Sequence, residues 1–400
     1  PLTSGKLRVS YGMNGNRSLA DPYIALANLY TGAGKTMGYI NNDGSVEQVK
    51  YLMCERLAND HLQWEKTTAY NFGLDLNFFE GRLTAAIDAY IMQTKDMIMN
   101  QSLPSFTGFN SITTNLGQVD NNGVELALTA IPVKTRNFEW NTTFNFSYNK
   151  NTIKHLYYEY DANGKENDDV ANKWFIGHDI NSIWDYQVTG IWQADEYAEA
   201  AKYGQVPGDP KVANLCTEND VMNEDGSVKS YTYNNDDKTF LGTTTPPIRW
   251  SWRNQFSLGN WEFSFRIYSL AGHKRTSTRF LNFDDDGGRM TYSMANKERK
   301  AYWTLSNPSD VYARIEAAGP TGAQKPVWVY NAGFIRFDNI ALSYTIPAKL
   351  TQKVDISRVK FFASVKNPFM IKFDKNWQYG DIEVDGLSIR TYTFGVNVTF

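Results

Sequence analysis

The last twelve residues of the chain constrain its fold more than any other segment. Within residues 389–400, aromatic and branched side chains alternate with threonine, glycine and asparagine. Because successive side chains of a strand point to opposite faces, one face of this strand is apolar and the other is polar. The apolar face consists of Tyr392, Phe394, Val396, Val398 and Phe400. An outer-membrane barrel needs this pattern in its closing strand, with lipid outside and a wet lumen inside; a terminal strand of a soluble β-sandwich alternates in the same way.

At least eight further segments repeat the alternation. They cover residues 72–78, 83–91, 126–130, 140–148, 248–258, 261–267, 340–346 and 359–365, and residues 7–11 add another near the start. Charged residues such as Arg249, Arg253 and Glu262 fall on the polar side of these segments. On a lipid-facing side, arginine or lysine would cost about 2–4 kcal/mol at the bilayer midplane. The positions of the charges therefore favour a membrane barrel.

Connections of two sizes alternate along the chain. Short connections lie at 80–81, 133–137, 259–260 and 348–355, and long polar ones at 13–63, 96–120, 151–246, 272–333 and 368–388. Bacterial barrels have short periplasmic turns and long outer loops. With Phe400 at the periplasmic end, every long connection lies outside. The pattern predicts an all-β fold of about 10–12 antiparallel strands, twelve if residues 182–193 and 207–214 add a pair.

Composition excludes several classes of protein. The net charge of −3 gives no basic surface for nucleic acid. Mean hydropathy is −0.48, and the chain lacks the run of about 18–20 apolar residues that a spanning helix needs. The four histidines are isolated, the sequence holds no G-x-S-x-G motif, and residues 32–36 match only half a phosphate-binding loop. We therefore expect no enzyme activity.

Two acidic turns and two cysteines leave questions open. Residues 161–164 and 284–288 offer oxygen ligands, but neither has the full spacing of a calcium loop. We expect no cofactor or metal, with calcium in an outer loop as the alternative to solvated turns. Cys54 and Cys216 match neither a disulfide framework nor a metal-ligand spacing, and the sequence does not tell whether they pair.

Several stretches together resemble a known family. They include L-R-V-S-Y-G-M-N-G-N (7–16), N-L-G-Q-V-D-N-N-G-V-E-L (115–126), P-G-D-P-K (207–211), and residues 62–79, 103–109 and 333–347. In this order they are similar to the C-terminal barrel portion of SusC/RagA-like TonB-linked outer-membrane importers. One departure is that residues 212–221 lack the D-x-N-x-D-G stretch that often follows P-G-D-P-K in the family, which weakens any metal role there.

The resemblance implies an architecture and partners. Such importers form a barrel of roughly 22 strands closed by a plug. Residues 1–400 would then be the C-terminal part of the barrel, with the plug and early strands missing from this chain. The expected location is the bacterial outer membrane, and the expected partners are a SusD-like lipoprotein, TonB acting through the missing N-terminal part, and the outer-membrane assembly machinery, which would read the closing strand.

The function implied is active import of a large nutrient, a glycan by default and a peptide as runner-up. Two alternatives remain: a barrel that anchors or scaffolds a surface assembly without transport, and a soluble β-rich glycan-binding protein. Tryptophans of the long loops are candidates for stacking on sugar rings or packing against the capping partner. They are Trp174, Trp184, Trp192, Trp303, Trp328 and Trp377. For each of them, interfacial anchoring or packing within the loops is the competing role.

Overall fold

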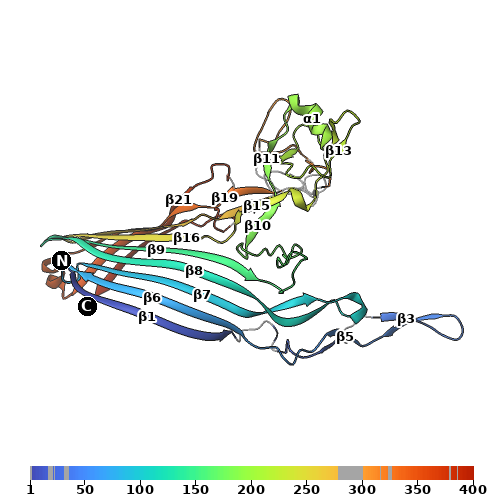
Figure 1. Cartoon of the computed structure of the whole chain (residues 1–400). Coiled ribbons are helices and arrows are strands. Elements are labelled where there is room, and N and C mark those ends of the chain that lie inside the picture. The colour runs from blue at the N-terminus through green and yellow to red at the C-terminus, as the bar shows by residue number, and fades with distance from the viewer. Residues whose placement is uncertain are drawn as a thin grey trace.

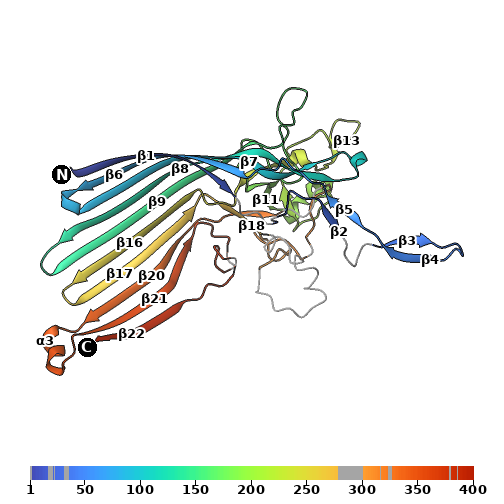
Figure 2. The ribbon, with the colours of Figure 1, turned by 90° about the horizontal axis from the view of Figure 1, so that it is seen from below.

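The computed structural model describes residues 2–16, 21, 23–30, 36–277, 301–315, 317–322, 327–377, 380–384 and 386–400. Ten of its strands lie side by side in one curved antiparallel sheet (Figures 1 and 2). In spatial order they are β1 (Leu2–Asn16), β6 (Glu65–Phe78), β7 (Leu83–Ser102), β8 (Ser111–Lys134), β9 (Phe138–His155), β16 (Ile248–Leu258), β17 (Trp261–Ala271), β20 (Phe334–Thr345), β21 (Arg358–Lys372) and β22 (Thr391–Thr399). This order follows the sequence, so the predicted all-β antiparallel sheet is confirmed.

The remaining elements are short. Six two-stranded sheets pair β2 (Asn28–Tyr30) with β5 (Met53–Arg56), β3 (Thr36–Ile40) with β4 (Val46–Lys50), β10 (Ser182–Tyr186) with β15 (Lys238–Thr243), β11 (Val188–Ile191) with β12 (Pro210–Val212), β13 (Val221–Met222) with β14 (Val228–Ser230), and β18 (Lys274–Ser277) with β19 (Trp328–Asn331). The helices are α1 (Tyr197–Lys202) and α3 (Ala348–Thr351). No helix in the described part of the chain has the length and apolar character needed to cross a membrane.

Strand register collects the alternating residues onto two faces of the large sheet. One row across β1, β6, β7, β8, β9 and β16 consists of Leu7, Leu74, Ile87, Leu126, Phe146 and Trp250. The next row consists of Arg8, Gly73, Asp88, Glu125, Ser147 and Arg249. Because the register is continuous, the predicted separation into an apolar and a polar face extends across strands. We call the second face the lumenal face.

Side chains of the apolar face are exposed, as a surface for lipid requires. In β1, Leu7 is 73% exposed, and at the C-terminus Phe394 and Phe400 are 78% and 87% exposed. Exposure of so many large apolar side chains is rare on water-facing protein surfaces. The closing strand β22 pairs with β21 from Thr391 to Thr399, with Tyr392, Val396 and Val398 on the same side as Phe394.

Loop lengths also match the expectation. The short turns, α3 and both termini lie at one end of the sheet, and the long connections gather at the other end (Figures 1 and 2). A small unit that carries α1, β11 and β13 stands off the long-loop end (Figure 1). The predicted alternation of short and long connections is therefore confirmed.

Two sequence expectations were wrong in detail. Residues 96–120 were expected to form a long loop, but β7 and β8 remain paired as far as Ser102 and Ser111. Where the strands extend beyond the lipid, they need no apolar face. The side chains there no longer alternate, although the backbone hydrogen bonds between β7 and β8 continue. Residues 182–193 and 207–214 contain β10, β11 and β12, which form separate small sheets and add no strand to the large sheet.

Candidate functional site

The lumenal face is held together by side chains that reach across glycines. The Arg8 guanidinium donates to both carboxylate oxygens of Asp75 on β6, at 2.9 and 2.8 Å, and to both of Asp88 on β7, at 2.9 and 3.0 Å. Gly73 lies between Arg8 and Asp88 in the register. A Cβ atom at Gly73 would lie 2.6 Å from Cζ of Arg8 and from Oδ1 of Asp88. Only glycine leaves room for this bridge over three strands.

A second crossing repeats this design one strand further along. Tyr90 on β7 donates its hydroxyl to Oδ1 of Asn149 on β9, at 3.1 Å, and passes over Gly123 on β8. A Cβ atom at Gly123 would lie 2.4 Å from the Tyr90 ring and 2.5 Å from the carbonyl oxygen of Tyr148. In β21 and β22, the Phe362 ring likewise lies over Gly395. Glycines of the polar face therefore serve close packing inside the lumen.

A hollow of about 420 Å³ lies on the lumenal face between β7 and β17. Its lining includes carboxylates, guanidinium groups and hydroxyls, contributed by Asp88, Glu125, Ser147, Arg249, Arg266 and Tyr268. Elsewhere on this face, Lys360 pairs with Glu262 at 3.0 Å. Charges of both signs make a wall that water and polar solutes can wet, and that is unsuited to hydrocarbon.

The connection between β21 and β22 is tied to the lumenal face by a buried ion cluster. Arg336 on β20 is 4% exposed, and its Nη2 donates to both carboxylate oxygens of Asp381 and to Glu383, each at 2.7 Å. Tyr268 on β17 donates its hydroxyl to the same Glu383 carboxylate, at 2.7 Å. A buried arginine needs such partners, because an unpaired buried charge is strongly destabilising. The cluster therefore fixes this loop over the sheet.

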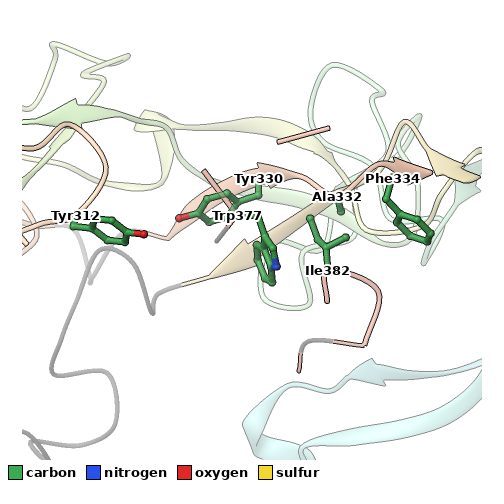
Figure 3. Close-up of a cluster of buried hydrophobic side chains, with 6 residues drawn as sticks. All are labelled: Tyr312, Tyr330, Ala332, Phe334, Trp377 and Ile382. Carbon is green, nitrogen blue, oxygen red and sulfur yellow. The ribbon is translucent and has the colours of Figure 1, made fainter. Parts of the chain in front are cut away.

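A buried apolar cluster of six side chains (Figure 3) adjoins the ion cluster, because the Arg336 guanidinium lies over the Phe334 ring, 5.4 Å from its centroid. Its members come from the β17–β20 connection, from the start of β20 and from the β21–β22 connection: Tyr312, Tyr330, Ala332, Phe334, Trp377 and Ile382. Trp377 is 2% exposed, and Trp328 packs partly buried against both this cluster and the next one. The structure thus places these two predicted contact residues within the packing of the outer loops.

Trp303 lies in a second cluster that joins the two longest connections. It packs with Ile191, Ala313 and Ala317, and its indole N–H donates to Gln193 at 3.1 Å. Trp192, from the other loop, donates to Gln205 at 2.9 Å. Both tryptophans are buried. Trp303 joins the β17–β20 connection to the β9–β16 connection, and Trp192 packs within the β9–β16 connection.

The P-G-D-P-K stretch lies at the centre of this joint. Asp209 is 1% exposed, and its Oδ1 accepts hydrogen bonds from Arg314 at 2.8 Å and from the backbone N–H of Ala318 at 3.0 Å. Gly208 has a φ of +91°, and a Cβ atom there would lie 2.5 Å from the Trp303 ring. We call residues 182–243 and 301–322 the two-loop unit. Asp209 and Gly208 hold its two segments together.

Trp174 lies near the outer ends of β7 to β9, and Trp184 lies on β10. Trp174 packs against a cluster that contains Met99 and Ile153, and Trp184 lies 4.9 Å from the Phe175 ring. Each is partly buried. The six tryptophans proposed for contact thus do not converge on one site. Contact between any of them and a substrate or partner stays a prediction.

Glu166 fixes the chain as it leaves β9. Its carboxylate lies 2.8 Å from Nδ1 of His155 and accepts hydrogen bonds from the backbone N–H groups of Leu156 and Tyr158, at 2.7 and 3.0 Å. Burial raises the pKa of the Glu166 carboxyl, but these hydrogen bonds outweigh burial and hold the pKa below its ordinary value. The carboxylate therefore stabilises this turn at neutral pH, and the contribution is lost as pH falls through the lowered pKa.

The described residues contain no group of three or more side chains placed to hold a metal ion. In the turn at 161–164, the Asp161 carboxylate accepts hydrogen bonds from the N–H groups of Asn163 and Lys165. Residues 284–288, and residues 32–35 of the partial phosphate-loop match, lie outside the described part. Cys54 and Cys216 are both free thiols.

Sequence reasoning missed the crossings and the ion cluster. A signal for the crossings was present, because Gly73, Gly123 and Gly395 all fall on the polar side of alternating strands, where an ordinary sheet gains nothing from glycine. Arg336 and Asp381 gave no such signal, since 45 residues separate them in the sequence.

Comparisons with known proteins agree with this architecture. A family model described as "TonB dependent receptor-like, beta-barrel" matches residues 2–367. TonB-dependent receptor P26 of Formosa agariphila is 26% identical over 99% of this chain, and TonB-dependent receptor SusC of Bacteroides thetaiotaomicron is 26% identical over 92%. The chain covers 40% and 34% of the lengths of these two relatives.

Among solved structures, one described as the RagAB peptide transporter has the same fold. It aligns with a TM-score of 0.72 and 23% identity over 100% of this chain and 41% of its own.

Substitution of Gly123 by alanine tests the lumenal crossings. The new Cβ would collide with the Tyr148 carbonyl, which the sheet holds in place, and would displace the Tyr90 ring. We expect a loss of about 1–3 kcal/mol of stability, measured as a lower midpoint of urea unfolding in detergent. Gly12→Ala is the matched control, because a Cβ at Gly12 meets nothing within 4 Å. Equal midpoints for the two variants would contradict the role of Gly123.

Asp209→Asn tests the two-loop unit. It removes the charge that Arg314 binds, and we expect a loss of about 2 kcal/mol of local stability. Limited proteolysis should then cleave the two-loop unit faster while the large sheet stays intact. The exposed Asp236 of the same loop gives the control Asp236→Asn. If both variants resist protease like the unaltered protein, Asp209 does not hold the unit together.

Proposed function

Because this chain belongs to the TonB-dependent receptor β-barrel family, we propose that it forms the C-terminal part of the wall of an active nutrient importer. Proteins of this family are integral to the outer membrane, and so is this chain. The observation that carries the proposal is the lumenal face, where charged and hydroxyl side chains line contiguous strands whose other side is apolar. A wall of this kind lets a large polar solute pass through hydrocarbon.

The proposal includes further strands and a plug from the same polypeptide, upstream of this chain. Within the described residues, β1 pairs only with β6, and β22 pairs only with β21. Two open edges in hydrocarbon would leave backbone groups without hydrogen bonds, which is not tolerated in a membrane. The upstream part would also carry the segment that contacts TonB and receives energy from it.

We assign the long-loop end of the sheet to the cell surface, where a SusD-like lipoprotein would cap the barrel. The substrate is a large polar nutrient, with an oligosaccharide as first candidate. Aromatic side chains that stay exposed in the outer connections, such as Phe106, Tyr160 and Tyr197, support a glycan, because aromatic faces stack on sugar rings. A peptide is second, supported by the described peptide transporter that shares this fold.

An outer-membrane scaffold without transport is the alternative, because the two-loop unit offers a rigid outer surface. The scaffold predicts altered surface assembly, whereas the importer predicts a growth defect. Neither proposed function includes a catalysed reaction, because the receptors of this family bind and transport.

Growth of a deletion strain separates the two functions. The strain lacks the full-length protein and grows on single polysaccharides, oligosaccharides or peptides as carbon source. We expect loss of growth on at least one polymer and normal growth on its monomers, because only the polymer needs active import. Normal growth on every polymer, with altered surface assembly, would favour the scaffold. Disruption of TonB should reproduce the import defect, and its failure to do so would contradict energised uptake.

The closing strand gives a second test. We propose that the outer-membrane assembly machinery reads the apolar side of β22, formed by Tyr392, Phe394, Val396 and Val398, together with the terminal Phe400. Phe400→Ala should lower the amount of folded barrel in the outer membrane several-fold, measured by heat-modifiable migration of membrane fractions. Thr399→Ala, on the opposite face, is the control. Equal levels for both variants would show that Phe400 is no assembly signal.

A further inference from the structure

A hollow of about 590 Å³ lies on the apolar face of the large sheet, near the end that carries the short turns. Its lining includes side chains from the apolar side of β17, β20, β21 and β22: Trp261, Leu342, Tyr344, Phe361, Ala363 and Phe394. Residues of the polar side that line it, such as Ser343 and Gly395, lie between these along the strands. The hollow therefore opens away from the lumen, and a plug inside the barrel does not fill it.

One small side chain makes the hollow. A register row across β17, β20, β21 and β22 consists of Phe263, Leu342, Ala363 and Phe394. Because Ala363 carries only a methyl group, the row has a gap between its two larger neighbours. An aromatic pair forms one wall, since the rings of Trp261 and Tyr344 lie 4.6 Å apart. Strands from upstream would pair beside β22 in the plane of the sheet, so they leave the gap on β21 open.

The turn that joins β20 to β21 carries positive charge next to the hollow. Its helix α3 contains Lys349, and Lys353 follows four residues later in the same helical turn. Both lysines are exposed and form no hydrogen bond or ion pair with any residue in the described part of the chain. Asp355 is the one acidic residue between positions 346 and 357. Leu350 is 57% exposed between the lysines, which is typical of a segment in a membrane interface.

The position of the hollow on the lipid-facing side selects its occupant. An acyl chain that enters the hollow gains dispersion contacts with the aromatic walls. Since the surrounding lipids are equally apolar, these contacts alone give little preference for one lipid over another. The headgroup decides, because each lysine near the membrane surface attracts a phosphate.

We propose that the hollow and the turn together bind one anionic glycerophospholipid of the inner leaflet, with an acyl chain over Ala363 and the phosphate at Lys349 and Lys353. The inference rests on the proposed function, which places the end with the short turns in the periplasm. Ala348 follows Tyr344 by four positions, at most about 14 Å of chain, so one lipid reaches from the hollow to the turn. A zwitterionic lipid carries an ammonium group that the lysines repel, and the site therefore prefers an anionic headgroup.

Native mass spectrometry of the purified full-length receptor measures which lipids stay bound. The probes are phosphatidylglycerol, phosphatidylethanolamine and phosphatidylcholine with identical acyl chains. We expect phosphatidylglycerol to bind most tightly. The double variant Lys349→Gln with Lys353→Gln should bind it about tenfold more weakly and bind phosphatidylcholine unchanged. Arg136→Gln is the matched control, because Arg136 is exposed in the β8–β9 turn at the same end of the sheet.

Ala363→Phe tests the hollow without removing a charge. The ring would fill the gap in the register row, so all three lipids should bind several-fold more weakly. Ala89→Phe is the control, because Ala89 lies on the apolar face between Phe72 and Val124, outside the hollow. Equal lipid binding by these two variants, both folded by heat-modifiable migration, would contradict the role of the hollow.

Fluorescence quenching locates the bound chain. The receptor is placed in nanodiscs of phosphatidylcholine that contain a small fraction of phosphatidylglycerol with brominated chains. Trp261 should be quenched more than Trp252, which lies on the apolar side of β16. Difference spectra against Trp261→Phe and Trp252→Phe isolate the two signals. Equal quenching would mean that phosphatidylglycerol mixes at random around the barrel, and would overturn the site.

The outcomes separate the lipid site from the function. If the lysine variant binds phosphatidylglycerol like Arg136→Gln while the deletion strain still loses growth on a polymer, the site is wrong and the importer stands. If the lipids bind as expected but the deletion strain grows on every polymer, the importer is wrong and the site belongs to a scaffold barrel. A second receptor copy that is bound in place of lipid and released by Ala363→Phe would make the hollow a protein interface and overturn the proposal.

Discussion

The structure depends on one constraint: a strand in hydrocarbon must pair every backbone N–H and C=O group and still show an apolar side to lipid. Antiparallel pairing across ten strands meets both demands. A slip of one residue would turn every side chain of a strand to the wrong face, and a bulge between Phe337 and Asn339 of β20 keeps Arg336 and Asn339 on the same face. Polar side chains are thereby forced onto the opposite face. The lumenal chemistry and the lipid-facing surface are thus two results of the same pairing.

Within the lumen, the size of one residue decides whether side chains two strands apart can meet. Gly73 lets Arg8 bridge to Asp88, and Gly123 lets Tyr90 reach Asn149. These crossings tie strands that are two apart in the sheet. In the outer loops, Asp209 holds two connections together through Arg314, and Arg336 holds the β21–β22 connection to the sheet through Asp381.

The bilayer imposes the same alternation of apolar and polar side chains on every strand, so the strands could be predicted from the sequence. Segments such as 140–148 and 391–399 show their faces through side-chain type alone, and loop lengths set their direction. The end of β7 and the start of β8 were missed because lipid no longer selects side chains there. The loops follow no period: Arg336 meets Asp381, and Asp209 meets Arg314, through tertiary folding that local pattern does not encode. For the tryptophans the sequence left two roles open, contact with a substrate or partner and packing within the loops, and Trp303 and Trp377 are buried in the loop clusters.

Labelling of single cysteines along β22 in intact outer membranes tests the central claim most directly. With Cys54 and Cys216 replaced by serine, cysteines are placed one at a time from Thr391 to Thr399. We predict that a water-soluble thiol reagent reaches cysteines at Thr393 and Asn397, and that lipid-borne nitroxides quench a fluorophore at Phe394 and Val396. Equal reagent access at all positions, or the reverse alternation, would contradict the assignment of lipid and lumen to the two faces.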